Sequence, residues 1–118
     1  MTPHVHKQHP PIEMPVVRAE EHESLLAQSS NRYDRYGCLL FRHCITEEMY
    51  AEWQRTTNWD GCRGKTELPE NLKKYVEDCV KNKFQIRERR DMKLLVDRVN
   101  ECLRSPRLSA KVRRSIYN

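Results

Sequence analysis

Apolar residues recur at steps of three and four along most of this chain, and this spacing constrains the fold more than any other feature. On a helix such residues lie on one face, whereas a half-buried strand needs an apolar residue at every second position. Three such stripes are present: Tyr33, Tyr36, Leu40 and Cys44; Leu72, Tyr75, Val76, Cys79 and Val80; and Met92, Leu95, Val96, Val99, Cys102 and Leu103. No convincing alternating run of four or more residues accompanies them. The sequence therefore predicts an all-α fold of three to five helices.

Helix start and stop signals divide the chain into segments. Four segments are predicted to be helical: 18–27, 32–43, 47–57 and 68–104. Asn31 and Thr46 are the expected N-caps of the second and third, because their side chains can accept from unpaired N–H groups of the first turn. Pro69 suits the first turn of the fourth. That segment is either one long helix or two helices with a joint at residues 87–91.

Prolines set the first segment apart from the rest of the chain. Four of them fall within the first fifteen residues, which excludes a helix there: Pro3, Pro10, Pro11 and Pro15. We predict an extended arm over residues 1–17, either disordered or laid along another protein. A helical domain over residues 18–105 and a basic tail over residues 106–118 follow it.

The chain is poor in apolar residues for a globular protein. Only 37% of its residues are hydrophobic and 33% are charged, and the mean hydropathy is −0.93. So little apolar surface barely offsets the conformational entropy lost on folding. We therefore expect an open, elongated arrangement of helices that borrows surface from a partner protein. Trp53, Trp59 and Tyr75 are the predicted anchors to that partner.

The positive charge is concentrated near the end of the chain. The net charge is +5, and residues 87–114 carry ten Lys and Arg against four Asp and Glu. This segment predicts contacts with an anionic partner: RNA phosphate, acidic lipid headgroups or an acidic protein. A solvated helix face is the alternative. The candidate contact residues are Arg87, Arg89, Arg90, Arg104, Arg107, Lys111, Arg113 and Arg114.

Five cysteines are more than a chain of 118 residues usually carries. None lies in the closely spaced pairs typical of zinc sites, so no metal is expected. Cys44 and Cys62 bracket the third helix and are a candidate disulfide, with buried free thiols as the equal alternative. Cys79 and Cys102 lie on apolar stripes, where buried thiols are favoured.

Several function classes are disfavoured by what the sequence lacks. Three glycines cannot build a glycine-rich phosphate loop, and no nucleophile motif surrounds any cysteine. A non-enzyme without a cofactor or small-molecule substrate is therefore predicted. No apolar run is long enough to span a membrane, and the first residues resemble neither a secretory signal nor a standard transit peptide.

A helical chain with cysteines, a proline-rich start and a basic end resembles the small accessory subunits of mitochondrial respiratory complexes. The nearest comparison is the coiled-coil-helix-coiled-coil-helix type, although its defining twin C-x9-C pairs are absent here. The resemblance implies a non-catalytic subunit that brackets its neighbours at the mitochondrial inner membrane. The alternative hypothesis is a protein subunit of an organellar ribosome or other ribonucleoprotein. A filament-lining or cytoskeletal protein is the third.

Overall fold

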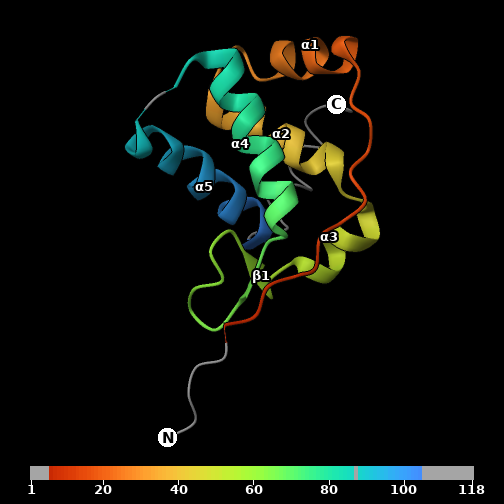
Figure 1. Ribbon diagram of the computed structural model, residues 1–118, viewed down its shortest axis with the longest axis vertical. Coiled ribbons are helices and arrows are strands. Elements are labelled where there is room, and N and C mark those ends of the chain that lie inside the picture. The colour runs from red at the N-terminus through yellow and green to blue at the C-terminus, as the bar shows by residue number, and fades with distance from the viewer. Residues whose placement is uncertain (1–5, 87, 105–118) are drawn as a thin grey trace, which may run out of the picture.

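The computed structural model describes residues 6–86 and 88–104, and within them it is helical, as predicted. Its helices are α1 (Ala19–Gln28), α2 (Tyr33–Cys44), α3 (Glu47–Trp53), α4 (Glu70–Phe84) and α5 (Arg89–Arg104). Two strands of two residues each, β1 (Thr57–Asn58) and β2 (Thr66–Glu67), lie between α3 and α4. Figure 1 shows α2 at the centre, with α4 and α5 beside it. No helix of the described part is both long enough and apolar enough to cross a bilayer.

The helix boundaries follow the sequence signals with two corrections. The third helix, predicted over 47–57, ends at Trp53, because Thr57 already pairs in β1, and the predicted cap of α2 is also different. The Thr46 hydroxyl accepts from the backbone N–H of Met49 at 3.1 Å, so the predicted cap of α3 is confirmed. Asn31 is not the cap of α2, because it adopts a left-handed conformation with φ of 59° and Arg32 takes that position instead. Gln85, with φ of 52°, ends α4. The segment 68–104 therefore forms two helices.

The helices share one core rather than an open arrangement. Sixteen apolar residues from all five helices and the connections between them are buried in a single cluster. α2 packs against α1, α4 and α5. At the crossing of α2 with α4 and α5, a Cβ on Gly37 would lie 2.3 Å from Leu95 Cδ1 and 3.0 Å from Val80 Cγ2. Glycine is therefore what lets these helices approach so closely.

Two of the three predicted partner anchors lie within this core, and the third packs against it. Trp53 and Trp59 are 3% and 4% exposed, so neither offers an aromatic surface to another protein. Tyr75 is half-buried, and its hydroxyl contacts His22 Nε2 at 3.2 Å. Trp53 and Trp59 are therefore poor partner anchors, because their own chain covers them, whereas the prediction for the partly buried Tyr75 stays a prediction.

The described part of the N-terminal arm, residues 6–17, is extended and lies along its own chain. Glu67 in β2 donates its N–H to the Lys7 carbonyl at 2.8 Å and accepts from the His9 N–H at 2.9 Å. The Asn71 side chain bonds the N–H and carbonyl of Ile12 at 3.2 and 2.7 Å. Figure 1 shows the arm running from α1 past α3 to the strands. β2 also pairs in parallel with β1, a feature the helical pattern did not predict.

Candidate anion-binding cleft

The segment between α3 and α4 is built from tight turns. Arg55, Gly61, Arg63 and Gly64 have positive φ of 65°, 73°, 58° and 75°. The Asn58 side chain organises the first turn, accepting from the Gly61 N–H at 2.6 Å and donating to the Cys62 carbonyl at 3.1 Å. Such side-chain bonds to the backbone stabilise a turn in the way a backbone hydrogen bond would. The residues of this loop are thereby held in fixed directions.

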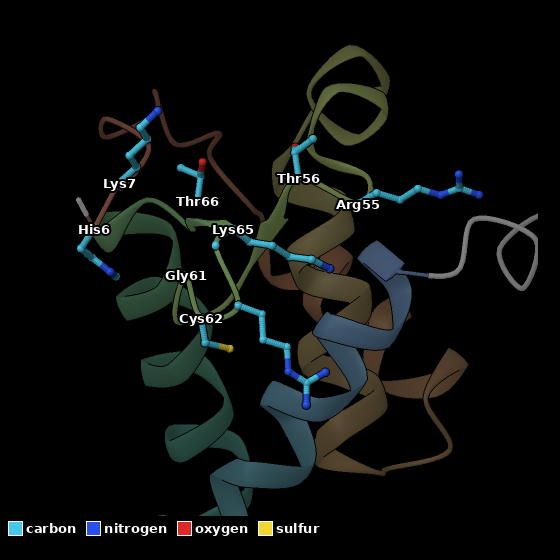
Figure 2. A pocket seen from close by; sticks show the side chains of 10 residues that line it. His6, Lys7, Arg55, Thr56, Gly61, Cys62, Lys65 and Thr66 are labelled. Carbon is cyan, nitrogen blue, oxygen red and sulfur yellow. The ribbon is translucent and has the colours of Figure 1, made fainter. Parts of the chain in front are cut away.

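Strand pairing brings this loop and the arm together around a cleft. The Thr66 N–H donates to the Thr56 carbonyl at 2.9 Å, and the Glu67 N–H donates to the Lys7 carbonyl on its other side. The cleft has a volume of about 1090 Å³. Its lining residues, shown in Figure 2, are His6, Lys7, Arg55, Thr56, Gly61, Cys62, Arg63, Gly64, Lys65 and Thr66.

The lining is cationic and contains no carboxylate. Lys7, Arg55, Arg63 and Lys65 contribute four positive charges, and none of them forms an ion pair with another described residue. Figure 2 shows Lys65 projecting from the loop toward the C-terminal end of α5, and Arg55 running outward from the segment after α3. Positively charged side chains that surround a cleft without a carboxylate to neutralise them favour the binding of an anion.

Glu67, which follows the lining residue Thr66, has a carboxylate that other residues already neutralise. Glu67 Oε1 lies 2.5 Å from His6 Nε2, and its second oxygen pairs with the buried ammonium of Lys73. Burial would raise the pKa of Glu67, but hydrogen bonds and the charges of Lys73 and His6 more than offset that, so the pKa is lowered. Glu67 therefore stays ionised and its charge is directed at these two partners.

The groups in the cleft suit binding better than catalysis. Guanidinium and ammonium groups, with the Thr66 hydroxyl beside them, are donors for phosphate or carboxylate oxygens. Cys62 and His6 share the cleft, but Figure 2 shows the Cys62 thiol pointing away from the imidazole, and Asn58 Nδ2 contacts its sulfur at 3.3 Å. Among the residues that the structure covers, no cluster of three His, Cys, Asp or Glu side chains is placed to hold a metal ion.

The basic residues predicted from the sequence are not those of the cleft. Arg90 pairs with Glu88 at 2.6 Å and Arg104 with Glu101 at 2.8 Å, while Arg89 is exposed. The remaining candidates lie outside the described residues: Arg87, Arg107, Lys111, Arg113 and Arg114. The cleft residues were not predicted, because the net charge of residues 1–86 is close to zero and no excess of basic residues stands out there. Arg63-Gly64-Lys65 in a turn is the local signal that could have found them.

The candidate disulfide between Cys44 and Cys62 is not present. Both are free thiols: Cys44 is buried in the core, where burial raises its pKa to about 12, and Cys62 is exposed at the cleft. The alternative prediction of a buried thiol therefore holds for Cys44. Cys79 and Cys102 are half-buried against the core, as their places on apolar stripes suggested.

Comparisons with known proteins give a partial likeness. The chain is 39% identical over 49 residues to a protein named Protein Pat from Xenopus laevis. This match covers 42% of the chain but only 17% of the Xenopus protein. No protein-family profile matches the chain, and no solved structure does either.

Proposed function

We propose that this protein is a non-catalytic binding subunit whose cleft holds the phosphate backbone of single-stranded RNA, within a ribonucleoprotein. The observation that carries this proposal is the cleft itself: four cations, two hydroxyl-bearing threonines and no carboxylate in its lining. Phosphodiesters are the most abundant polymeric anions that such donors fit, and they supply most of the affinity in nucleic-acid complexes.

The shape and lining of the cleft indicate backbone rather than base recognition. No Phe, Tyr or Trp side chain lines it, and the nearest tryptophans are buried beneath the arm and loop. Proteins that read single-stranded bases stack them on exposed aromatic rings. Binding is therefore expected to be nearly independent of base sequence.

Salt dependence gives the first test. Each phosphate contact on a single strand contributes about −0.7 to the slope of log affinity against log salt, so four contacts predict a slope of roughly −3. The measurement is fluorescence anisotropy of a labelled 12-nucleotide RNA against the full-length protein at several KCl concentrations. Two strands of equal length and different composition should bind alike.

Charge removal in the cleft gives the second test. Arg63→Ala combined with Lys65→Ala should weaken binding about tenfold or more and reduce the slope by about 1.4. The matched control removes two exposed lysines of α4, Lys74→Ala with Lys81→Ala, whose ammonium groups already face Asp78 and Glu77. The control should change binding little. Equal losses in both variants, or loss only when the four basic residues at 107–114 are replaced, would contradict a role for the cleft.

Cys62 offers a direct reporter, because it is the exposed thiol at the cleft. Bound RNA should slow its alkylation by N-ethylmaleimide severalfold, and added KCl should restore the free rate. Alkylation of Cys62 at an unchanged rate, under conditions where anisotropy shows saturation, would place the RNA elsewhere.

The accessory-subunit hypothesis for a mitochondrial respiratory complex stays a prediction, as does its localisation. Its physical basis was a chain poor in apolar residues, whose two helical stripes would bury their apolar surface against neighbouring subunits. In the described residues, members of both stripes pack in the core of the chain itself, which makes this hypothesis the second candidate. Purification from native tissue, with identification of the co-purifying RNA and proteins, separates the two hypotheses.

A further inference from the structure

The hydroxyl of Thr66 lies in the cleft without a hydrogen-bond partner among the described residues. Its backbone N–H donates to the Thr56 carbonyl at 2.9 Å, which fixes Thr66 at the start of β2, but its hydroxyl bonds no residue of the described part. The Thr56 hydroxyl differs, because it donates to the Glu52 carbonyl at 3.0 Å. Figure 2 shows the Thr66 side chain standing out from β2 between Lys7 of the arm and Thr56. Of the two threonines in the lining, Thr66 is thus the one with an available hydroxyl.

The residues before Thr66 form a basic turn at the surface. The Lys65 N–H donates to the Cys62 carbonyl at 3.2 Å and closes the turn. Arg63 and Gly64, at its tip, are exposed. Arg63 lies three residues before Thr66, and no other Ser or Thr of the sequence has Arg or Lys at that distance. Protein kinases that favour basic substrates recognise such a charge pattern before the hydroxyl that they modify.

Thr66 also lies among cations that no described carboxylate neutralises. The four basic residues of the lining form no ion pair with another described residue: Lys7, Arg55, Arg63 and Lys65. A phosphate ester on this threonine adds a charge of about −2 at their centre. Guanidinium and ammonium groups form strong, charge-assisted hydrogen bonds with phosphate oxygens. The cleft can therefore be filled by a group attached to its own wall.

We propose that Thr66 is a phosphorylation site and that its phosphate occupies the cleft in place of RNA. The second part of this inference rests on the proposed function. A kinase transfers the γ-phosphoryl group of MgATP to Thr66 Oγ1. The bond from Oγ1 to phosphorus forms, the bond from phosphorus to the bridging oxygen of the leaving ADP breaks, and the hydroxyl proton is released. Because the phosphate is tethered beside the cations, it competes with RNA at a high effective concentration.

A local opening of the arm is enough to expose the segment around Thr66. β2 has only two residues, and two backbone hydrogen bonds join its Glu67 to the arm. Short paired segments at the surface open more readily than core helices. His9→Ala removes the stacking of the arm on Trp53, so this variant should be phosphorylated faster than the wild-type protein.

The first experiment maps the phosphate. The full-length protein is incubated with MgATP and the catalytic subunit of cAMP-dependent protein kinase, which selects basic substrates, and its tryptic peptides are analysed by mass spectrometry. Residues 64–73 contain Thr66 as their only Ser, Thr or Tyr, so the mass of this peptide identifies the site. The expected result is the peptide with one added phosphate in the wild-type protein and without it in Arg63→Ala and Thr66→Ala.

The second experiment measures RNA binding. Ser109 and Ser115, which follow other basic residues, are replaced by alanine so that Thr66 is the modified position. Phosphorylation should weaken binding of the labelled 12-nucleotide RNA about tenfold or more and make the salt slope shallower by about 1.4, because about two phosphate contacts are lost. Phosphatase treatment should restore both values. Incubation of Thr66→Ala with the kinase should leave that variant's own affinity as it was before.

The thermal midpoint gives a readout without RNA. Pairing of the new phosphate with the cations of the lining should raise the midpoint by about 3 °C or more at low salt and by less at high salt. Lys7→Ala combined with Arg55→Ala keeps the turn that the kinase recognises but removes two of the cations. The rise should therefore be smaller in this variant.

The proposal would be overturned by phosphate that appears in the wild-type chain only on hydroxyls other than that of Thr66. An RNA affinity unchanged by phosphate on Thr66 would overturn it as well, while leaving the proposed function in place. If the unmodified protein binds no RNA, the proposed function fails, and the peptide map and the midpoint still decide whether the cleft holds a phosphate on Thr66.

Discussion

At the scale of single residues, His22 joins three helices through its two ring nitrogens. Its Nδ1 lies 2.8 Å from the Tyr36 hydroxyl on α2, and its Nε2 lies 3.2 Å from the Tyr75 hydroxyl on α4. Burial lowers the pKa of His22, and the charges of Lys83 and His43 lower it further, with Glu21 opposing them. The imidazole is therefore neutral in the folded protein under conditions where the unfolded chain would already protonate it.

This difference predicts loss of stability in mild acid. A folded-state pKa below the unfolded value means that the unfolded chain binds more protons as the pH falls through about 6.5, so the free energy of unfolding decreases there. His9 shifts in the same direction, because burial lowers its pKa as well. Urea denaturation of His22→Gln should show a smaller drop between pH 7.5 and 5.5 than the wild-type protein. An identical drop would mean that His22 titrates alike in both states.

Replacing Gly37 with alanine should have two opposing effects on the free energy of unfolding. Alanine is a better helix former than glycine by about 1 kcal/mol. Its methyl group would, however, meet Leu95 at 2.3 Å and Val80 at 3.0 Å, and both side chains are fully buried. Overpacking of this kind costs about 1–3 kcal/mol, so Gly37→Ala should lower the free energy of unfolding. In the background of Leu95→Ala the same substitution should cost less, because the nearer obstacle is gone. Stabilisation by Gly37→Ala alone would show that the crossing is looser than described.

At the scale of elements, the arm is held by contacts of a different kind from those of the helices. His9 stacks on Trp53 with ring centroids 5.0 Å apart, and its Nε2 lies 2.8 Å from Thr57 Oγ1. These contacts, together with the backbone pairing to Glu67, fasten an extended segment across α3 and the strands. The arm thereby forms one wall of the cleft and covers a tryptophan.

His9→Ala should therefore loosen the arm. Loss of one ring stack and one hydrogen bond predicts a decrease of about 1–2 kcal/mol in the free energy of unfolding. Trp53 should also become more accessible to acrylamide quenching. Lys7→Ala is the matched control, since Lys7 pairs with β2 through its backbone carbonyl alone. It should keep both the stability and the quenching of the wild-type protein while weakening RNA binding. Equal effects of the two variants would contradict this division of roles.

The helices were predictable and the cleft was not, for one physical reason. Thr46 and Pro69 act on the turn that they begin, so their signals can be read from neighbouring residues. The pairing of the arm with Glu67 joins positions about sixty residues apart. It involves only two residues of strand, which is too short for the alternating apolar pattern of a strand to be recognised in the sequence. The prediction that Asn31 caps α2 was wrong because asparagine, which caps helices well, also tolerates the left-handed conformation that Asn31 adopts here.

At the scale of the whole molecule, composition proved a poor guide to how the apolar residues are arranged. A low average hydrophobicity says nothing of where the apolar residues lie. Here sixteen of them converge in one cluster, and Asp34 and Lys73 are the buried charged residues of the described part. Partly buried residues of the arm, Ile12, Met14 and Val17, pack against the same cluster. The extended segment thus adds apolar contacts to the core.

A single core shared by every helix predicts that the isolated protein unfolds cooperatively as a monomer. Because each helix buries its apolar face against the same cluster, none can leave without exposing the others, and partly folded states should be scarce. The enthalpy of unfolding should be roughly 0.7 kcal/mol per ordered residue near 60 °C, and the calorimetric and van't Hoff values should agree. Differential scanning calorimetry, with sedimentation equilibrium to establish the monomer, makes the measurement. A broad transition that sharpens only at high protein concentration would instead show that the chain depends on neighbours for its shape, and would restore the accessory-subunit hypothesis over the cleft as the guide to function.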